Sequence, residues 1–538
     1  MPKFCGVPKP SAIIHALIMA RVLSSPTNLH NRYLNQKETN MPQYLSPGVY
    51  VEEVPSAVKP IAGVSTSTAC FIGIFDAIRI PRENPKYDPT KEVNDNNQPS
   101  LVDEFKFINK PEERAQALKD ASAALKTASD DLAAKKKALA ENKEEKRTEE
   151  LSTAVADAEG PRASAERRRA FVETHAEADT PVLCTNFTDF TRSFGGFSIP
   201  PAPPAQAAPT PASPAGSAPT TLLSTANVLA HAVYGFFNNG GTRCYVVRYA
   251  SEADLSADAF SHLEAIDEIA LVAAPGITVP AVQQMVVDHC TKMQDRFAIL
   301  DVPQKPKILT VDGINSAPVR NTDFAAIYFP WIKVFDLPTK LQDPKGDGEI
   351  AVPPSGHIAG IYARVDNERG VHKAPANEVV RGALSVEYQI SKAIQDGLNP
   401  SGVNCIREMN NRIVVWGART VGGDFNTDLK YINVRRTLLF LRESIDEGTQ
   451  WVVFEPNDRT LWAKIVRNVT AFLTTVWRAG ALFGSTPAEA FYVKCDDETN
   501  PPEERDLGRV TTEIGVAIVK PAEFVIFRIS QWAGPQGK

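Results

Sequence analysis

The fold class is decided by residues 269–302, whose sequence is IALVAAPGITVPAVQQMVVDHCTKMQDRFAILDV. The apolar run at 269–274 predicts a strand that ends at a Pro-Gly turn. Apolar residues at helical spacing then predict a helix over 279–293, and a second apolar run predicts a strand over 297–302. This order and length favour a parallel pair of strands joined by a right-handed crossover helix.

Elements of the same kind lie on both sides of this unit. Residues 69–75 (ACFIGIF) predict a buried strand, and residues 225–238 (TANVLAHAVYGFFN) predict a helix. After an Asn-Gly-Gly turn, residues 244–249 (CYVVRY) predict a further strand. The middle of the chain is therefore expected to be an α/β domain.

The last third of the chain continues the alternation. A long helix is predicted from a cap at Asp458 to Arg478, with one apolar stripe made of Leu461, Ile465, Val469, Phe472, Leu473 and Val476. A shorter helix is predicted at 434–446. Strands are expected at 412–416, 451–454, 491–494, 510–519 and 524–529.

Between residues 111 and 178 the composition changes to Ala, Glu, Lys and Arg. Leucines recur every seven residues at Leu118, Leu125, Leu132 and Leu139, which predicts a coiled-coil-like helix. Gly160-Pro161 is expected to break it, so that a second helix at 162–177 completes a helical hairpin or short bundle. The segment is either a projecting spacer or contact module, or a solvated insertion with its own seam.

Two proline-rich segments are expected to lie outside any core. Residues 200–219 (PPAPPAQAAPTPASPAGSAP) predict a stiff surface loop. Near the N-terminus, a Ser-Pro-Gly turn leads into the short extended segment 49–54, which Pro55 ends. This segment has no partner nearby in sequence, so it is expected to pair at long range or with another molecule.

Bulk composition narrows the class of partner. The 538 residues suggest several folding units, and 43% hydrophobic with 23% charged residues is ordinary for globular proteins. A net charge of -6 does not indicate a face for nucleic acid, so we expect protein partners and no nucleic acid. Seven scattered cysteines without a C-x-x-C pair predict reduced, mostly buried thiols.

The first forty residues form either a disordered leader or a stretch that precedes the true start at Met41. Residues 12–23 (AIIHALIMARVL) are the single candidate for a targeting sequence, but His15 and Arg21 interrupt the apolar run. That run is too short to span a membrane, so no direct membrane insertion is expected.

No motif for chemistry stands out, and we expect neither catalysis nor a cofactor or metal. The sequence contains no G-x-x-x-x-G-K-[ST], no H-E-x-x-H and no G-x-S-x-G. Asp288-His289-Cys290 lies on a predicted helix, where adjacent side chains point in different directions and cannot share one ion. Ser355-Gly356-His357 is interpreted as a helix start, and Cys405 has no neighbouring histidine in sequence.

Several stretches together resemble the contractile tail sheath family, which includes bacteriophage tail sheaths and the sheaths of phage-like contractile injection systems. The C-terminal ones are IVVWGARTV (413–421), YINVRRTLLFLRESI (431–445), VFEPN (453–457), GALFGSTPAEAFYVKCD (480–496) and PAEFVI (521–526). Earlier ones are SPGVYVEEV (46–54), APG (274–276) and GHIAGIYARVDNERGVHKAPAN (356–377). The helical segment, the Pro/Ala loop and the leader lie outside the resemblance.

The resemblance implies a structural subunit that stacks as hexameric rings into a helical homo-oligomer around an inner tube protein, with baseplate and terminal cap proteins as further partners. Contraction would drive the tube through a target envelope, without nucleotide hydrolysis. The subunit would assemble in the bacterial cytoplasm as part of a phage tail or tail-like particle. Phage, extracellular and membrane-anchored systems all remain open.

The expected fold class is multidomain α/β and α+β, with a C-terminal mixed α/β sheath domain, a middle α/β domain, a helical insertion and two extended arms. The expected boundaries are a leader at 1–40, an N-terminal arm at 41–68, the start of the outer domain at 69–110, the helical insertion at 111–178, the middle domain at 179–400, the inner sheath domain at 401–520 and the C-terminal arm at 521–538.

In such sheaths the two arms add strands to sheets of neighbouring subunits. The N-terminal arm here would comprise Pro47, Gly48, Val49, Tyr50, Val51, Glu52, Glu53 and Val54, and the C-terminal arm Phe524, Val525, Ile526, Phe527, Arg528 and Ile529. Both are extended, apolar and close to proline, as strand addition requires. Basic residues off the stripe of the long helix, Lys464, Arg467 and Arg478, either face the tube or only solvate the helix.

Two other classes of function compete with the sheath. One is a soluble α/β enzyme whose site has no recognisable motif. The other is a fibre or baseplate adhesion component that binds through the helical segment.

Overall fold

The computed structural model describes residues 60–528, except 85, 89, 92–96, 98–99, 199–224, 307–308, 311–312 and 314–320. The expected leader, the N-terminal arm residues 47–54, the loop 200–219 and Ile529 lie outside the described residues. The chain divides into a unit of residues 1–57 and a unit of residues 58–538, and all that follows concerns the second.

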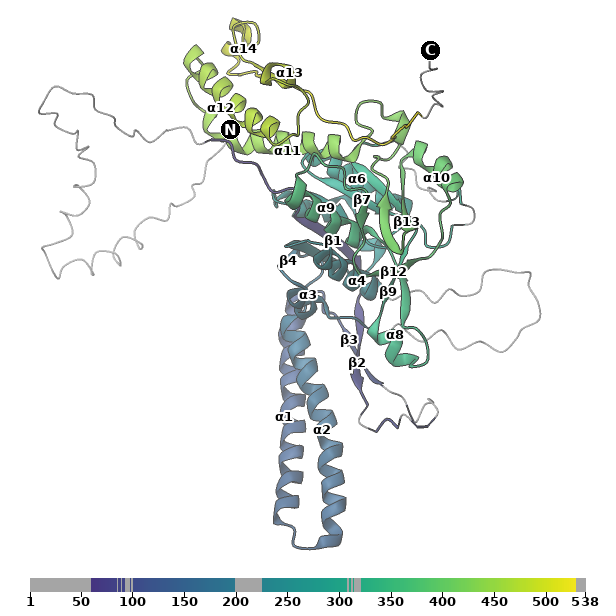
Figure 1. Cartoon of the computed structure of the whole chain (residues 1–538). Helices are drawn as coiled ribbons and strands as arrows, with labels where there is room; N and C mark the ends of the chain where they lie inside the picture. The colour runs from purple at the N-terminus through teal and green to yellow at the C-terminus, as the bar shows by residue number, and fades with distance from the viewer. Residues whose placement is uncertain are drawn as a thin grey trace, which may run out of the picture. The chain divides into compact units, whose positions relative to one another are not determined.

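A nine-stranded mixed sheet forms the centre of this unit, in the order β11-β14-β13-β8-β7-β6-β1-β5-β4 (Figure 1). In that order, the strands are Glu378–Val379, Arg412–Trp416, Val403–Met409, Ala325–Phe329, Phe297–Asp301, Leu271–Ala273, Ala69–Ile74, Cys244–Tyr249 and Val182–Cys184. The six from β13 to β5 are parallel, and β14, β11 and β4 join through antiparallel pairs. The predicted parallel pair is confirmed as β6 and β7, and α6 (Pro280–Met293) lies between them in sequence.

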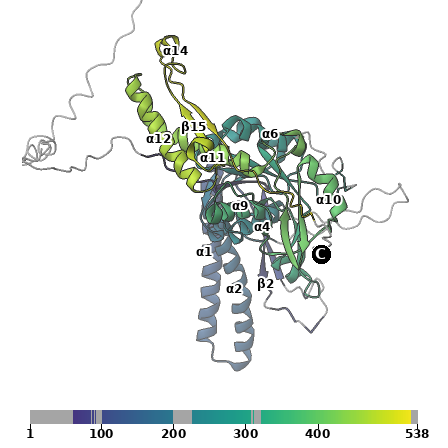
Figure 2. The ribbon, with the colours of Figure 1, turned by 45° about the horizontal axis from the view of Figure 1, so that its top comes forward.

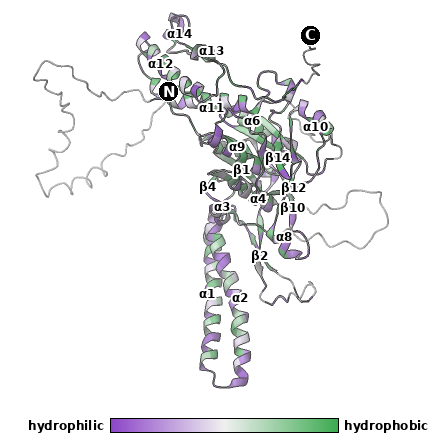
Figure 3. Cartoon of the chain, viewed as in Figure 1, coloured by the Kyte–Doolittle hydropathy of each residue, from purple (hydrophilic) through white to green (hydrophobic). Residues whose placement is uncertain are grey.

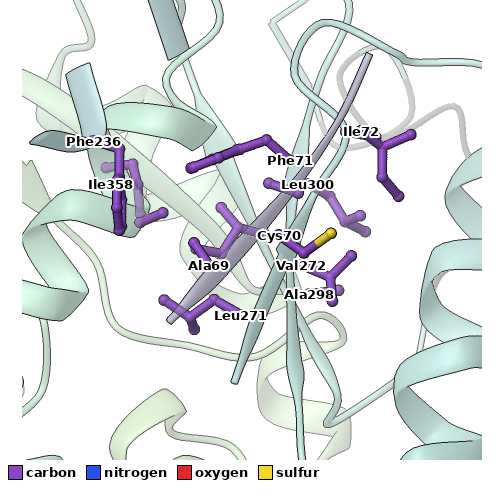
Figure 4. Close-up of a cluster of buried hydrophobic side chains, with 14 of the residues drawn as sticks. Ala69, Cys70, Phe71, Ile72, Phe236, Leu271, Val272, Ala298, Leu300 and Ile358 are labelled. Carbon is purple, nitrogen blue, oxygen red and sulfur yellow. The ribbon is translucent and has the colours of Figure 1, made fainter. Parts of the chain in front are cut away.

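The inner strands β1, β5, β6, β7 and β8 are buried on both faces, in keeping with their nearly continuous apolar runs. Phe71 of β1 meets Phe236 edge to face, with ring centroids 5.3 Å apart, and Figure 4 shows both beside the strand residues of β6 and β7. Phe236 belongs to α4 (Thr225–Asn238), which packs against α9 (Ser355–Arg369). Gly356 and Gly360 permit this close approach, because a Cβ on either would lie 2.4 Å from backbone atoms of α4.

Three small sheets and further helices complete the described part. The sheets are β10-β9-β12 (Glu349–Val352, Ile332–Phe335, Ala383–Val386), β15-β16 (Phe491–Lys494, Glu513–Val516) and β2-β3 (Ala77–Glu83, Ser100–Lys106). The remaining helices are α1 (Pro111–Glu141), α2 (Glu145–Thr174), α3 (Phe187–Phe194), α5 (Ser261–Glu264), α8 (Leu337–Gln342), α10 (Lys392–Leu398), α11 (Ile432–Thr449), α12 (Arg459–Arg478), α13 (Pro487–Ala490) and α14 (Pro502–Asp506). None of the helices described is long and apolar enough to cross a membrane.

The helical hairpin is confirmed, but its predicted turn is wrong. α2 continues through Pro161, and the turn lies at 142–144, where the Asn142 side-chain amide donates to the Glu144 carbonyl at 2.8 Å. A proline inside a helix loses one hydrogen bond, and packing along α1 maintains the helix on both sides of it. Figures 1 and 2 show the two helices side by side, and Figure 3 shows polar residues along both.

One further strand prediction is wrong. Residues 450–452 form a 3-10 turn in place of the predicted strand 451–454, and Phe454 follows with a positive φ of 69° and a fully exposed ring. The apolar run there only links α11 to α12, so it has no strand to pair with among the described residues. Residues 524–528 form no strand within their own subunit, and the partner predicted for them is a neighbouring copy.

Candidate inter-subunit interface

The C-terminal segment is held to its own subunit as far as Glu523. Past β16, the Val519 N–H donates to the Ala481 carbonyl at 3.1 Å, and the Asn433 side-chain amide donates to the Val519 carbonyl at 3.1 Å. The Glu523 carboxylate then accepts two hydrogen bonds from Arg419, at 2.8 and 2.9 Å. Residues 517–523 therefore follow the surface of the body along a fixed path.

Glu523 has a complete set of partners. Besides Arg419, the Asn399 amide donates to it at 2.8 Å and the Tyr431 hydroxyl at 2.9 Å. Partial burial acts to raise the pKa of Glu523, but these hydrogen bonds outweigh it and hold the pKa below its ordinary value. Arg419 is almost fully buried, so the pair is both charged and shielded from water.

Beyond Glu523 the chain loses these contacts. Phe524, Val525, Ile526 and Phe527 are 70, 68, 78 and 83% exposed, and Arg528 is exposed as well. The predicted strand is absent over 524–528, because a strand needs a partner and none of the described residues pairs with this segment. Four consecutive exposed large apolar side chains are a surface that soluble proteins normally cover.

The N-terminal segment is also fixed where it joins the body. The Thr66 hydroxyl donates to Asp366 at 2.6 Å, and the Thr66 carbonyl accepts from Arg436 at 2.9 Å. Arg436 and Asp366 form a bidentate ion pair, at 2.9 and 2.6 Å, whose side chains are 3 and 4% exposed. Residues 60–67 thus lie against α9 and α11, whereas the predicted arm at 47–54 lies outside the described residues.

The hairpin of β15 and β16 has open edges in the described part of the chain. The two strands pair only with each other there, from Phe491 with Val516 to Lys494 with Glu513. The hairpin packs on α12, and both belong to a second apolar cluster with Leu482 and Trp462 (Figure 2). An isolated two-stranded sheet is marginally stable, and its outer edges carry unpaired backbone groups that can accept additional strands.

The long helix α12 matches its prediction closely. The Asp458 side chain accepts from the Leu461 N–H at 2.7 Å as the N-cap, and all six residues of the predicted stripe are buried. Of the three candidate tube-facing residues, Arg467 and Arg478 are exposed and Lys464 is half-buried. All three lie off the buried stripe.

The residues considered for chemistry are structural in the described part of the chain. Ser355 begins α9 as predicted, and its hydroxyl and N–H donate to the buried Asp301 at 2.6 and 3.0 Å. His357 and Cys405 are buried, and burial raises the pKa of the Cys405 thiol to about 12. Among the described residues, no group of three His, Cys, Asp or Glu side chains could hold a metal ion.

Two buried histidines should make the subunit sensitive to acid. Burial lowers the pKa of His357 to about 3 and that of His289 to about 4, from about 6.5 in the unfolded chain. Below pH 6.5 the unfolded chain therefore binds protons that the folded subunit does not. We expect each histidine to lower the free energy of unfolding by about 2 kcal/mol between pH 7 and pH 5.

Asp301 acts in the opposite direction over the same range. Burial raises its pKa to about 6, so the folded subunit gains about 1 kcal/mol of stability from it as the pH falls to 5. The net effect is still a loss, which urea unfolding at pH 7 and pH 5 measures. His357→Asn cannot take up the proton and should show a drop about 2 kcal/mol smaller. Equal drops in both proteins would contradict the assignment.

Sequence reasoning missed the ion pairs that fix the two segments. Arg419 and Glu523 are 104 positions apart, and Asp366 and Arg436 are 70 apart, so no local pattern joins them. All four residues of these two ion pairs do lie in stretches that carry the family resemblance, which was the single available signal. The exposed ring of Phe454 was also missed, because its run was interpreted as a strand.

Two family models match the chain. The model described as the phage tail sheath protein central domain covers residues 250–421, and the model described as the phage tail sheath C-terminal domain covers residues 424–531. Together they match more than half of the chain. The chain belongs to the phage tail sheath protein family. The predicted family is confirmed, and it is a family of structural sheath proteins rather than of enzymes.

A curated relative agrees with this sheath assignment. A tail sheath protein of Burkholderia phage BcepMu is 28% identical over 211 residues, which are 38% of this chain and 42% of that protein. The match thus spans less than half of the relative's length.

Solved sheath structures share the fold over most of the chain. The sheath of the extracellular contractile injection system PVC, in its contracted state, has a TM-score of 0.58 at 21% identity and covers 91% of this chain and 99% of that one. A chain in the 6-fold symmetrised baseplate of the anti-feeding prophage has a TM-score of 0.55 at 23% identity, with 91 and 99% coverage. The mixed α/β fold is therefore sheath-like, and the nine-stranded sheet continues across the expected domain boundary at residue 400.

Proposed function

We propose that this sheath subunit polymerises as stacked hexameric rings around an inner tube and contracts to drive the tube through a target envelope. The observation that carries the proposal is the abrupt change at Glu523, where a tightly held segment becomes four exposed apolar side chains. Such a segment is suited to complete a sheet of another copy, because β-addition takes its strength from backbone hydrogen bonds and its register from alternate side chains.

The acceptor in this proposal is the β15-β16 hairpin of a neighbouring subunit. Its two outer edges are free among the described residues, and α12 supports it from one side. One edge would take the C-terminal arm, residues 524–529, and the other the N-terminal arm, residues 47–54. Glu52 and Glu53 would pair with basic groups of the neighbouring subunit, although surface carboxylates contribute little.

The proposed pairing between subunits also suggests where each domain would lie in the sleeve. Of the expected inner domain 401–520, the part that follows β14 would form the inner layer, with Lys464, Arg467 and Arg478 toward the tube. β13 and β14 belong to the nine-stranded sheet and would lie further out with residues 179–400. The helical insertion 111–178 would project away from the tube. Baseplate and terminal cap proteins would bind the ends of the sleeve, which assembles in the bacterial cytoplasm before the particle acts.

Electron microscopy of the purified full-length chain tests the proposal. We expect long hollow sleeves with six subunits per ring, formed by the sheath protein alone or with its tube protein. Averaged images should place density for residues 524–529 on the hairpin of an adjacent copy. Persistent monomers with a turnover activity would refute the proposal.

A further inference from the structure

The two fixed segments described above meet on one short stretch of the chain. The C-terminal segment is held by Arg419 and Tyr431 through Glu523, and by Asn433 through Val519. The N-terminal segment is held by Arg436 through Thr66 and Asp366. We refer to Arg419, Tyr431, Asn433 and Arg436 as the α11 anchor.

The α11 anchor is internally connected. Arg419 and Tyr431 form an antiparallel bridge, and the Ile432 N–H donates to the Ala418 carbonyl at 3.0 Å, so the strand end before α11 is tied to its first turn. Asn433 and Arg436 are three positions apart on α11, which places them as neighbours on one face. Tyr431, Asn433 and Arg436, which hold the two fixed segments, thus lie in the N-cap and first turns of α11, and the bridge to Tyr431 ties Arg419 to them.

We infer that the α11 anchor couples the two arms mechanically, so that a pull on one arm reaches the other through the start of α11. This inference rests on the proposed function, since it requires that both arms engage neighbouring copies. The inference adds a path of force transmission within one subunit, in which a force applied at Glu523 is transmitted to Thr66. Such a route would let a displacement pass from ring to ring while each body moves as a unit.

Two features of the contacts support the inference. Both ion pairs are bidentate, the geometry that fixes position most strictly, and the arginine of each pair is almost fully buried. The Arg436 guanidinium also lies 4.7 Å from the centre of the Tyr362 ring, which limits its movement. Two segments fixed to one helix share its displacement, and a coupling between them acts equally in both directions.

Hydrogen exchange of the unassembled subunit tests the coupling through two conservative variants. Glu523→Gln removes the charge at the C-terminal attachment, and Thr66→Val removes the hydroxyl that donates to Asp366. The reporters are the Val64 N–H, which donates to the Ser444 hydroxyl at 3.1 Å, and the Val519 N–H, which donates to the Ala481 carbonyl at 3.1 Å. We expect each variant to accelerate exchange about tenfold at its own attachment and several-fold at the other.

The matched control is Arg459→Gln, which breaks an exposed ion pair with Asp497 near α12 and should change neither reporter. Acceleration confined to the mutated attachment would overturn the coupling, whether or not sleeves form. In sleeves, the two variants should have non-additive effects on the urea concentration that dissolves them. Additive effects would likewise overturn the coupling.

Failure of the wild-type chain to form sleeves would instead count against the proposed function. Hydrogen exchange in the free subunit would still decide whether the α11 anchor couples the two attachments.

Discussion

A subunit that lacks residues 524–538 should fold normally and fail to polymerise. The deletion begins after Glu523, so every described contact that holds the C-terminal segment to the body is retained. What is lost is the burial of four large apolar side chains against another copy, worth about 6 kcal/mol or more. We therefore expect the concentration needed for assembly, measured by sedimentation and electron microscopy, to rise more than about a thousandfold.

A pair of point variants separates strand addition from simple loss of apolar surface. Ile526→Pro removes a backbone N–H that a sheet would use, whereas Ile526→Val retains it with a similar side chain. The valine variant should assemble and the proline variant should not, if that N–H faces the acceptor. Circular dichroism and the urea midpoint of all three proteins should match the full-length subunit. Unfolding of the truncated protein would show that the segment belongs to its own core.

Replacing Asp366 with alanine should cause one of the largest losses of stability available in this chain. The substitution leaves the guanidinium of Arg436 buried at 3% exposure without its carboxylate, and it also frees Thr66. Removing one member of a buried ion pair typically costs about 3–5 kcal/mol, much of it from the unpaired charge. Urea unfolding of the unassembled subunit measures the change.

The double variant Asp366→Ala/Arg436→Met provides the critical comparison. Because it removes both charges, it should be less destabilised than the sum of the two single variants. Asp497→Ala, which breaks the exposed pair with Arg459, should change stability by less than about 1 kcal/mol. A loss for Asp366→Ala as small as that for Asp497→Ala would contradict the structural role of the pair.

Local patterns predicted the fold well where the cause of an element lies within the element itself. The cap at Asp458 and the stripe from Leu461 to Val476 sufficed to place α12, because capping and amphipathic spacing act over a few residues. Pro161 led to the wrong prediction of a helix break, because what maintains α2 there lies outside α2. Its cost to α2 is local, but the packing of α1 along the same helix offsets it, and that packing is not visible in the residues around the proline.

The candidate interface could be predicted only in part. Apolar composition beside proline singled out the C-terminal segment, whose residues 524–527 are exposed in the structure. The last contact of that segment with its own subunit is the ion pair between Glu523 and Arg419. These two residues are 104 positions apart in the sequence. Residues so far apart in sequence share no local pattern. The point at which the C-terminal segment leaves the surface of its own subunit could therefore be located only from the structure.

The base of the helical hairpin has a consequence of another kind. The Ile108 N–H reaches the His175 ring at 3.2 Å, and Arg114 donates to the Val172 carbonyl at 3.1 Å, so the chain leaves and re-enters the body at adjacent points. An insertion closed in this way can be lengthened, shortened or exchanged for another domain without moving the residues on either side. The hairpin is therefore a natural position for engineered decoration of the particle and for divergence among related sheaths.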